Sequence, residues 1–451
     1  MAYDQLIHNA LLLPLEPGSS PLGQGFVAIN GTRIAAVGQV REGAALPEAG
    51  QKWDVNGRVV MPGLVNCHCH AAMTLFRGLA DDLPLMEWLQ RYIFPAEARW
   101  VNEDFVYTGA LLAAAELIRG GVTTVADAYF CEAGARRALA QAGLRAVLAQ
   151  GVIDFPAPGV PDPKDNLRVA REFINSGQEC GSARLIATLF CHSPYTCGAE
   201  TLQAAKQLTR SRNLPFFIHV AETQEEVSQS LRRTGQTPVA YLDRLGLLDQ
   251  QTVVVHGVWL NERDRELLAL RQVKFCHCPE SNLKLASGMA PVADLLERRL
   301  VLGLGTDGAA SNTNLDMWGE MSLAARLHKV AALDPTILPA RQVLELATCS
   351  GAQVLGLAEV TGTLTPGKEA DLIAVDLHQP HLTPLYDPYS HLVYAAGAHD
   401  VMDVMVGGRW LLRNRQFLSL AWPEIRHRVL QWASRLAGEP ALGNANIAGG
   451  V

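Results

Sequence analysis

The sequence predicts an α/β fold: a (β/α)8 TIM barrel that carries a small β-sandwich domain built from both chain ends. Eight short β-branched runs alternate with Ala- and Leu-rich helical stretches through the middle of the chain, and β-hairpin patterns flank this region on both sides. A doubly wound sheet is the alternative for the same alternation. We expect the sandwich in residues 1–58 and 361–415, the barrel in residues 59–360, and a C-terminal helix and tail in residues 416–451.

The two flanks read as β-hairpins. Gly25 to Val40 alternates apolar and polar residues around Asn30-Gly31, a dipeptide that suits a type I′ turn. Near the other end, Asp371 to Asp376 reads as a strand, and Val404 to Leu412 folds about Gly407-Gly408. Neither flank is long enough to close a core of its own, so we expect the two to pair in space as one small domain.

The eight runs of the middle region are the predicted barrel strands. They are Val59 to Asn66, Val122 to Asp127, Arg145 to Val152, Leu185 to Cys191, Phe216 to Val220, Thr252 to His256, Val273 to Cys276 and Val301 to Gly305. Helical patterns such as Phe105 to Arg119 and Leu202 to Arg210 separate them. After Trp422, Glu424 to Ala437 predicts a helix, and the Gly- and Asn-containing tail beyond it is expected to be loosely held.

Composition limits the partners and the compartment. The net charge of -7 argues against nucleic acid as a partner. The start of the chain lacks a basic segment, and Pro14 breaks the apolar run Ala10 to Leu13, so we expect no signal peptide, no membrane span and a cytoplasmic protein. Nine cysteines, an odd number, favour reduced thiols. Cys67 to His70 lacks the second ligand pair that a zinc finger requires.

Four histidines and one aspartate lie at the predicted strand ends. His68 and His70, at positions i and i+2, project from one face of the first strand. His219, His256 and Asp307 come at the ends of the fifth, sixth and eighth strands, where barrel enzymes place their active sites. Each alone has a structural explanation, a satisfied core histidine or an Asp-Gly turn. Together they predict a metal site, because their joint burial without a cation is costly.

These residues lie in motifs that resemble the amidohydrolase superfamily. The signature-like stretch is Met61-Pro62-Gly63-Leu64-Val65-Asn66-Cys67-His68-Cys69-His70, and His219-Val220-Ala221-Glu222 resembles the deaminase branch. The similarity extends to Val255-His256-Gly257, Ser281-Asn282-Leu283-Lys284-Leu285 and Gly305-Thr306-Asp307-Gly308. Within the superfamily the chain most resembles the 5-methylthioadenosine/S-adenosylhomocysteine deaminases, through His68 to Arg77, Trp88-Leu89, Pro95-Ala96-Glu97 and His192-Ser193-Pro194-Tyr195.

The resemblance implies hydrolytic deamination of the adenine ring of 5′-methylthioadenosine, S-adenosylhomocysteine or adenosine, giving the inosine-type product and ammonia. The expected ligands are His68, His70, His219 and Asp307. Imidazole and carboxylate suit one zinc ion per subunit, with iron(II) as the alternative metal. Related binuclear enzymes use a bridging Lys or Glu. Because the fourth strand ends in Phe190-Cys191-His192, without a lysine, we expect a single metal.

The catalytic roles follow from residue type and the resemblance together. Asp307 is expected to accept the proton of the attacking water, and Glu222 to protonate N1 of adenine. The resemblance gives His256 the role of orienting the nucleophile or stabilising the developing charge. Glu222 has the alternative explanation of a solvated residue that opens a helix, since acidic side chains favour that end.

Five residues are predicted to read the substrate, together with the Ser281 to Lys284 loop at the rim. The resemblance assigns the ribose hydroxyls to Glu97, the ribose or purine to His192, an apolar wall to Trp88 and a place near the base to Ser311. Glu97 at a helix start and Trp88 at helical spacing also fit purely structural roles. Gln150, which follows Leu148-Ala149 near the end of the third predicted strand, occupies the place where relatives that bind a carboxylate can carry an arginine.

The neutral Gln150 and the apolar stretch Val152 to Pro158 predict a preference for 5′-methylthioadenosine over S-adenosylhomocysteine, unless Lys164 or Arg168 supplies the missing charge. The alternative function is a deaminase or chlorohydrolase acting on guanine, cytosine or a triazine, and Glu97 argues against it because those rings carry no ribose. A scaffold without catalysis is the other alternative, and the filled ligand positions argue against that. We expect a homo-oligomer, a dimer or a tetramer.

Overall fold

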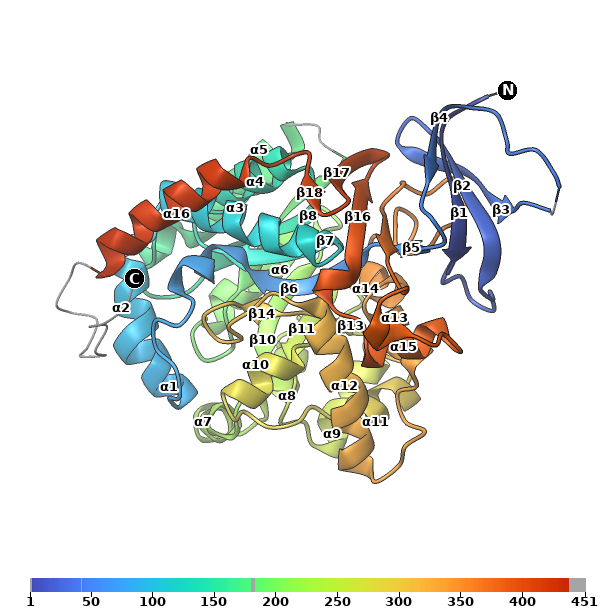
Figure 1. Ribbon diagram of the computed structural model, residues 1–451. Helices are drawn as coiled ribbons and strands as arrows, with labels where there is room; N and C mark the ends of the chain where they lie inside the picture. Colours follow the sequence, from blue (N-terminus) through green and yellow to red (C-terminus); the bar gives the residue numbers. More distant parts are fainter. Residues whose placement is uncertain (1, 42, 180–182, 438–451) are drawn as a thin grey trace.

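The computed structural model describes residues 2–41, 43–179 and 183–437, and has the predicted α/β architecture (Figure 1). A closed parallel barrel lies beside a smaller sheet domain. The predicted tail, residues 438–451, lies outside the described residues. The eight cysteines of the described part carry free thiols. Among the described helices, none combines the length and the apolar character that crossing a membrane requires.

The barrel strands follow one another in chain order. They are β6 (Leu64–His70), β7 (Val122–Tyr129), β8 (Arg145–Val152), β9 (Leu185–Cys191), β10 (Phe216–Val220), β11 (Thr252–His256), β12 (Lys274–His277), β13 (Val301–Leu304) and β14 (Asp307–Gly308). The short β14 continues from β13 and pairs with β6, which closes the barrel. A doubly wound sheet would reverse its strand order partway, so the barrel prediction is confirmed.

Helices surround the barrel and connect its strands. The main ones are α3 (Glu103–Arg119), α4 (Glu132–Ala142), α5 (Asn166–Glu179), α6 (Ala199–Arg210), α7 (Gln224–Thr234), α8 (Pro238–Arg244), α9 (Glu262–Leu270), α10 (Pro279–Lys284), α11 (Val292–Glu297), α12 (Met317–Ala332), α13 (Ala340–Leu346) and α14 (Cys349–Val354). Between β6 and α3 the chain forms η1 (Ala71–Phe76), α1 (Leu85–Trp88), η2 (Leu89–Ile93) and α2 (Phe94–Trp100). The 3-10 turn η3 (Pro163–Asp165) precedes α5.

The first predicted strand, Val59 to Asn66, is two strands in two different sheets. β5 (Val59–Pro62) belongs to the smaller sheet, and β6 begins the barrel at Leu64. The chain passes from one sheet to the other at Gly63. The Gly63 N–H donates to Asp371 O, beside the smaller sheet, at 3.1 Å, and the Leu64 N–H donates to Gly121 O, beside the barrel strand β7, at 2.9 Å. A Cβ at Gly63 would clash with the Thr123 side chain. The prediction of one strand was wrong because an apolar run looks the same in either sheet.

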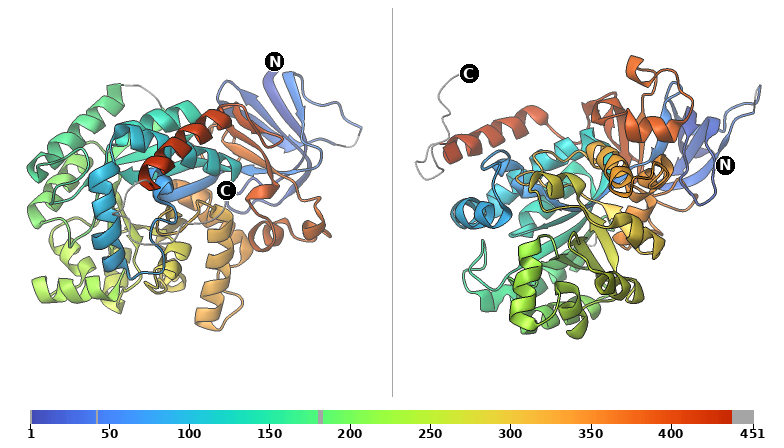
Figure 2. Two further views of the ribbon diagram at one scale, coloured as in Figure 1. Left: turned by 60° about the vertical axis from the view of Figure 1, so that its left-hand side comes forward. Right: turned by 90° about the horizontal axis from the view of Figure 1, so that it is seen from below.

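The smaller sheet combines both ends of the chain in the order β18-β17-β16-β15-β5-β1-β2-β3, with β4 paired to β1. Its strands besides β5 are β1 (Tyr3–Leu12), β2 (Leu22–Asn30), β3 (Arg33–Gln39), β4 (Ala49–Asp54), β15 (Leu372–Val375), β16 (Val401–Val406), β17 (Arg409–Arg413) and β18 (Gln416–Phe417). Both predicted hairpins form, closed by Asn30↔Arg33 and Val406↔Arg409. Figure 2 shows the blue and the orange-to-red strands side by side, next to the barrel.

The contacts that attach the C-terminal part of the chain to the barrel include those of Arg145 and of the C-terminal helix. The buried Arg145 of β8 donates to Asp371 at 2.7 Å and to Glu369 at 3.3 Å, beside β15. The C-terminal helix α16 (Trp422–Ala437) packs on α3, where the rings of Trp432 and Phe105 meet edge to face at 5.2 Å. The connection from β15 to β16 carries η4 (Pro380–Leu382), α15 (Pro388–Tyr394) and η5 (Ala398–Asp400).

Candidate active site

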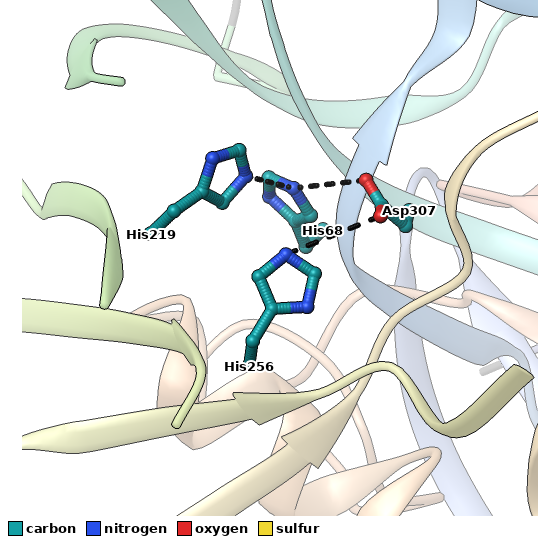
Figure 3. Close-up of side chains that lie close together, drawn as sticks. All are labelled: His68, His219, His256 and Asp307. Carbon is teal, nitrogen blue, oxygen red and sulfur yellow. Dashed lines mark hydrogen bonds and ion pairs between the residues drawn. The ribbon is translucent and has the colours of Figure 1, made fainter. Parts of the chain in front are cut away.

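The predicted metal-binding residues meet at one rim of the barrel. His68 and His70 end β6, His219 lies at the end of β10, His256 ends β11 and Asp307 begins β14. All are at the carboxyl ends of parallel strands, which open on the same face of a barrel. In Figure 3, His68, His219, His256 and Asp307 point towards one another. The strand ends therefore bring together residues that are up to 239 positions apart in the chain (68 to 307).

Short distances join the polar atoms of this cluster. His68 Nε2 lies 3.1 Å from His219 Nε2 and 3.5 Å from Asp307 Oδ1. His256 Nε2 lies 4.0 Å from Asp307 Oδ2. One ligand atom from each of these four residues falls within 4.8 Å of the others. The four side chains are buried and offer three nitrogens and one oxygen to a shared ion.

His70 lies beside this group of four. Its Nε2 is 3.2 Å from Asp307 Oδ1, and its ring centroid is 4.7 Å from that of His68. Its Nδ1 donates to the Ala128 carbonyl oxygen, so the Nε2 lone pair faces the cluster. The structure thus brings five candidate groups together. His256 belongs to the compact group of four, whereas the sequence-based ligand set contained His70 in its place.

The donor chemistry of the cluster fits a divalent cation. Burial lowers the pKa of His68 to about 4 and that of His219 well below its ordinary value, so both imidazoles are neutral at physiological pH. Burial acts to raise the pKa of Asp307, but contacts with His68 and His70 hold it well below its usual range. Three imidazole nitrogens and one carboxylate oxygen that converge in a buried site form a donor set that suits zinc, and burying them together without a cation is costly. The residues present therefore fit a bound metal.

A cavity opens over this cluster, and His70, His219, His256 and Asp307 form part of its lining. Of the residues predicted to act on substrate, Trp88, Glu97, His192, Glu222 and Ser311 all line it. Apolar side chains form much of the remaining wall, namely Met73, Leu85, Leu89, Ile93, Phe94, Phe130, Val152, Phe190 and Leu285. A largely apolar pocket with a few convergent polar groups is typical of a small-molecule site.

Glu222 lies in the cavity but outside the compact metal-binding group. Its Oε2 is 3.9 Å from His256 Nε2, and burial raises the pKa of its carboxyl. Glu226 holds the segment in place by accepting hydrogen bonds from the N–H groups of Ala221, at 2.9 Å, and of Glu222, at 2.8 Å. The helix α7 begins only at Gln224, after its cap Thr223, so Glu222 precedes the helix and is buried rather than solvated.

Glu97 is a second buried carboxyl in the same cavity, on α2. Burial raises its pKa to about 7, against the lowering effect of a hydrogen bond from the Tyr129 hydroxyl. That hydroxyl donates to Glu97 Oε1 at 2.6 Å. Tyr129 ends β7 and also lines the cavity. Its partnership with Glu97 was not predicted, because nothing in the sequence relates positions 97 and 129.

His192 is also neutral, because burial lowers its pKa to about 3. Its Nδ1 shares a hydrogen bond with Thr196 Oγ1 at 3.0 Å, within the turn that follows β9. Trp88 ends α1 and is buried against the cavity. Ser311 donates to Asp307 Oδ2 at 3.0 Å, so this residue contacts the metal-binding cluster as well as the cavity.

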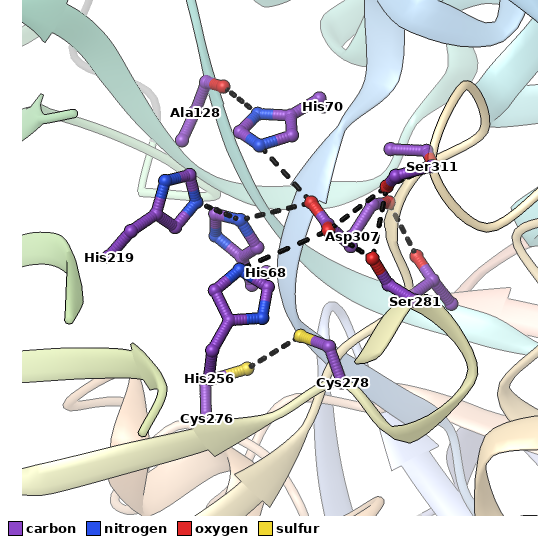
Figure 4. A network of polar contacts seen from close by, with 12 residues as sticks. His68, His70, Ala128, His219, His256, Cys276, Cys278, Ser281, Asp307 and Ser311 are labelled. Carbon is purple, nitrogen blue, oxygen red and sulfur yellow. Dashed lines mark hydrogen bonds and ion pairs between the residues drawn. The ribbon is translucent and has the colours of Figure 1, made fainter. Parts of the chain in front are cut away.

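The segment predicted as a loop, Ser281 to Lys284, is part of the helix α10. Ser281 donates to Asp307 Oδ2 at 2.6 Å (Figure 4). Asn282 Oδ1 accepts from His256 Nδ1 at 2.9 Å. The loop prediction was wrong, although Pro279 at the first helical position was a usable signal. Instead of only shaping the rim, α10 orients two of the residues that converge on the cluster.

Backbone features that the sequence did not reveal fix the aspartate and one histidine. His256 and Asp307 have φ angles of 71° and 59°, in the left-handed region that non-glycine residues rarely adopt. Asn66 on β6 accepts from the Thr306 N–H at 3.1 Å and donates to Thr306 Oγ1 at 2.7 Å. The position of Asp307 relative to β6 therefore depends on hydrogen bonds across 240 residues.

Gln150, which was predicted to contact the substrate, is not among the described residues that line the cavity. Its amide oxygen accepts from the Glu132 N–H at 3.2 Å, and its nitrogen donates to Gly151 O at 3.3 Å. The two following residues of β8 line the cavity instead. Arg168 pairs with Asp165 at 3.1 Å and Glu172 at 3.0 Å on the surface. Neither Arg168 nor Lys164 is among the described residues that line the cavity.

Comparison with known proteins agrees with this geometry. Residues 59–411 match the Amidohydrolase family. The chain belongs to this amidohydrolase family. It is 48% identical to a 5-methylthioadenosine/S-adenosylhomocysteine deaminase of Syntrophobacter fumaroxidans, over 94% of this chain and 97% of the relative. It is 45% identical to a 5′-deoxyadenosine deaminase of Methanothermobacter thermautotrophicus, over 91% and 99%.

A solved structure of similar fold is an adenosine deaminase of Xanthomonas campestris with bound zinc. It is 37% identical, with a TM-score of 0.94, and the match covers 97% of this chain and 99% of that one. The resemblance drawn from the strand-end motifs is therefore confirmed: this amidohydrolase is similar over nearly its whole length to enzymes that deaminate adenosine-type nucleosides.

Proposed function

We propose that this amidohydrolase is a zinc-dependent deaminase that converts the 6-amino group of an adenosine-type nucleoside to the inosine-type product and ammonia. The observation that carries the proposal is a single cavity lined by a His/Asp cluster and by two buried carboxyls, Glu222 and Glu97. The names of the similar enzymes, and the zinc in the similar solved structure, support the same reading.

We assign His68, His70, His219 and Asp307 as the ligands of one zinc ion, with iron(II) as the alternative. A bound zinc ion supplies Lewis acidity and makes water a nucleophile near neutral pH. Asp307, whose pKa lies well below its usual range, is ionised and able to accept a proton from that water. Ser281 and Ser311 both donate to its Oδ2 and keep the carboxylate in place.

Glu222 is proposed to donate a proton to N1 of the adenine ring as C6 is attacked. Burial raises the pKa of its carboxyl and so favours the protonated form that a donor requires. His256, 3.9 Å from Glu222 and 4.0 Å from Asp307, lies between the proton donor and the proton acceptor. Because Asn282 accepts from its Nδ1, the Nε2 atom of His256 is free to orient the nucleophile.

Glu97 is proposed to accept hydrogen bonds from the ribose hydroxyls. Its carboxyl is buried in the cavity wall, and the Tyr129 hydroxyl fixes one of its oxygens. Trp88 and His192 would complete the nucleoside pocket, with Ser311 near the base. Guanine, cytosine and triazines lack the ribose that Glu97 would bind, so they are the weaker candidates.

The 5′ substituent is proposed to be small and uncharged. The described lining of the cavity includes no lysine or arginine, and apolar side chains of η1, α1, η2 and β8 form much of its wall. This supports 5′-methylthioadenosine over S-adenosylhomocysteine, whose carboxylate would lack a cationic partner. The same wall suits 5′-deoxyadenosine, on which one of the similar enzymes acts by name.

The test has two measurements on the purified enzyme. Elemental analysis gives its metal content, and ammonia release is measured with 5′-methylthioadenosine, 5′-deoxyadenosine, S-adenosylhomocysteine, adenosine, guanine and a triazine. We expect one zinc per chain in the barrel site, and kcat/KM for the first two substrates at least about tenfold above that for S-adenosylhomocysteine. Equal or better turnover of S-adenosylhomocysteine would refute the 5′ assignment. Turnover of guanine or the triazine alone would refute the nucleoside assignment.

We also propose that the enzyme acts in the cytoplasm as a homo-oligomer, a dimer or a tetramer. Val330 near the end of α12 and Leu333 directly after it are 72% and 90% exposed, and such an assembly could cover these two apolar side chains. Light scattering on the purified protein measures the mass, and a monomer at micromolar concentration would contradict the assembly.

A further inference from the structure

A second group of side chains that could bind a metal ion comes from the connection between β15 and β16, and it contains none of the barrel-rim residues. Between β15 and β16 the chain leaves the small sheet after Val375 and returns to it at Val401, carrying η4, α15 and η5. The Asp376 N–H donates to Asp400 O at 2.9 Å, which closes the base of this excursion. His381 lies in η4, and His399 and Asp400 lie in η5. The cluster therefore joins the segment that follows β15 to the segment that precedes β16.

Both imidazoles converge on one carboxylate oxygen. His381 Nε2 lies 3.2 Å from Asp400 Oδ2, and His399 Nε2 lies 3.4 Å from the same atom. The two rings are 5.3 Å apart and inclined by 38°. The three potential ligand atoms fall within 4.8 Å of one another. Two imidazole nitrogens and one carboxylate oxygen are the donor set that zinc uses in open sites, where water completes the coordination.

The carboxylate is fixed while the imidazoles reach solvent. Asp400 is 2% exposed, and its Oδ2 also accepts from the Gly397 N–H at 2.9 Å. Arg415 holds η5 through its backbone, donating to the carbonyl oxygens of Ala398 at 2.8 Å and His399 at 3.0 Å. The side chains of His381 and His399 are 43% and 69% exposed. An ion can therefore reach three preplaced donors and keep water on its outer side.

We propose that His381, His399 and Asp400 bind one divalent transition-metal ion, with zinc as the ion tested, separately from the barrel site. The ion links η4 to η5, and so holds together the two ends of the connection between β15 and β16. No step of the proposed deamination uses these residues. The three ligands lie together only in the folded protein. Binding of the ion therefore raises the free energy of unfolding and leaves the activity unchanged.

The first test counts metal on the full-length, untagged enzyme. The barrel site is loaded, the protein is dialysed against micromolar zinc, and bound zinc is measured by elemental analysis. We expect two zinc ions per chain in the wild type and one in His381→Ala and in His399→Ala. The matched control is His378→Ala, because His378 is 63% exposed and lies near the cluster but pairs with Asp376 instead. This control should keep both ions.

The second test measures heat stability and activity together. Added zinc should raise the Tm of the loaded wild type by roughly 1 to 3 °C, and should leave the Tm of His399→Ala unchanged. Ammonia release should be the same in wild type, His378→Ala and His399→Ala, which shows that the barrel metal is intact. A wild type with one zinc per chain would overturn the proposal, as would a second zinc that survives both histidine variants or is lost equally in the control.

Discussion

The barrel-rim cluster and the cluster at the base of the excursion contain the same two kinds of ligand, histidine and aspartate, but differ in burial. The rim residues are buried, and burial lowers the pKa of His68 to about 4. In the other cluster only Asp400 is buried, and both histidines are open to water. Exposed donors can be satisfied by water, whereas buried ones cannot. We infer that a cation is a requirement of the first cluster and an addition to the second.

The two clusters also differ in how they are built. Parallel strands of the barrel carry the rim residues, and their carboxyl ends must meet at one face. Two short 3-10 turns carry the other cluster, and the Arg415 side chain holds η5 by donating to its carbonyl oxygens. Buried ligands on the rigid strands of the barrel suit a catalytic metal. Ligands at the two ends of one connection suit a metal that stabilises the structure.

The largest expected effect separates the clusters by activity. His219→Ala should lose the barrel metal and lower kcat by roughly four orders of magnitude, because metal activation of water contributes several kcal/mol. His399→Ala should keep kcat. Elemental analysis and ammonia release on both variants test this difference. Equal losses of activity would erase the distinction between the two sites.

Within the rim, Glu222→Gln should separate proton donation from metal binding. The variant should retain its barrel metal, because Glu222 lies outside the compact group, and lose about two to four orders of magnitude in kcat. Metal content and single-turnover rates measure the two effects. Metal loss matching that of His219→Ala would instead make Glu222 a ligand.

Glu97→Ala should lower kcat/KM for ribosides by about 30- to 150-fold, the equivalent of roughly 2 to 3 kcal/mol for one charged acceptor. The loss should be smaller for the 2′-deoxyriboside, which has one hydroxyl fewer to bind. Adenosine and 2′-deoxyadenosine provide the comparison. A uniform loss on both substrates would reduce Glu97 to a structural partner of Tyr129.

Asn282→Ala should lower kcat by about 10- to 100-fold and leave KM and the bound metal nearly unchanged, because the residue acts by orienting His256. Asn282→Asp keeps an oxygen that accepts from His256 Nδ1, and should recover most of the rate. If the aspartate variant is no better than the alanine variant, α10 does not act through this hydrogen bond.

The smallest effect concerns pH. The pKa of Glu97 is raised to about 7, so its carboxyl is protonated below that pH and ionised above it. The ionised form is the better acceptor for ribose hydroxyls. The ratio of kcat/KM for adenosine to that for 2′-deoxyadenosine should therefore fall, by less than about tenfold, between pH 8 and pH 6. Glu97→Gln should flatten the ratio, and a flat wild-type profile would contradict the assignment.

Most of the barrel was predictable, because its strands are apolar runs bounded by polar or helical segments. The strands Arg145–Val152, Leu185–Cys191 and Thr252–His256 have the predicted bounds. The largest departure is at residues 59–66, where the chain changes sheets at Gly63. Periodicity describes the faces of one strand and does not say which neighbour accepts its hydrogen bonds. The transfer from one sheet to the other was therefore not predictable.

Residue type and strand-end position by themselves determined the rim cluster, because the strands of a parallel barrel bring their carboxyl ends to one face. The family was indicated by the resemblance of the motifs around these residues. The tertiary structure alone decided the residues that orient the cluster. Asn66, Asn282 and Tyr129 act through partners 240, 26 and 32 positions away. It also brought His381 to Asp400. Such contacts depend on how packed elements are juxtaposed, and local sequence patterns do not contain that information.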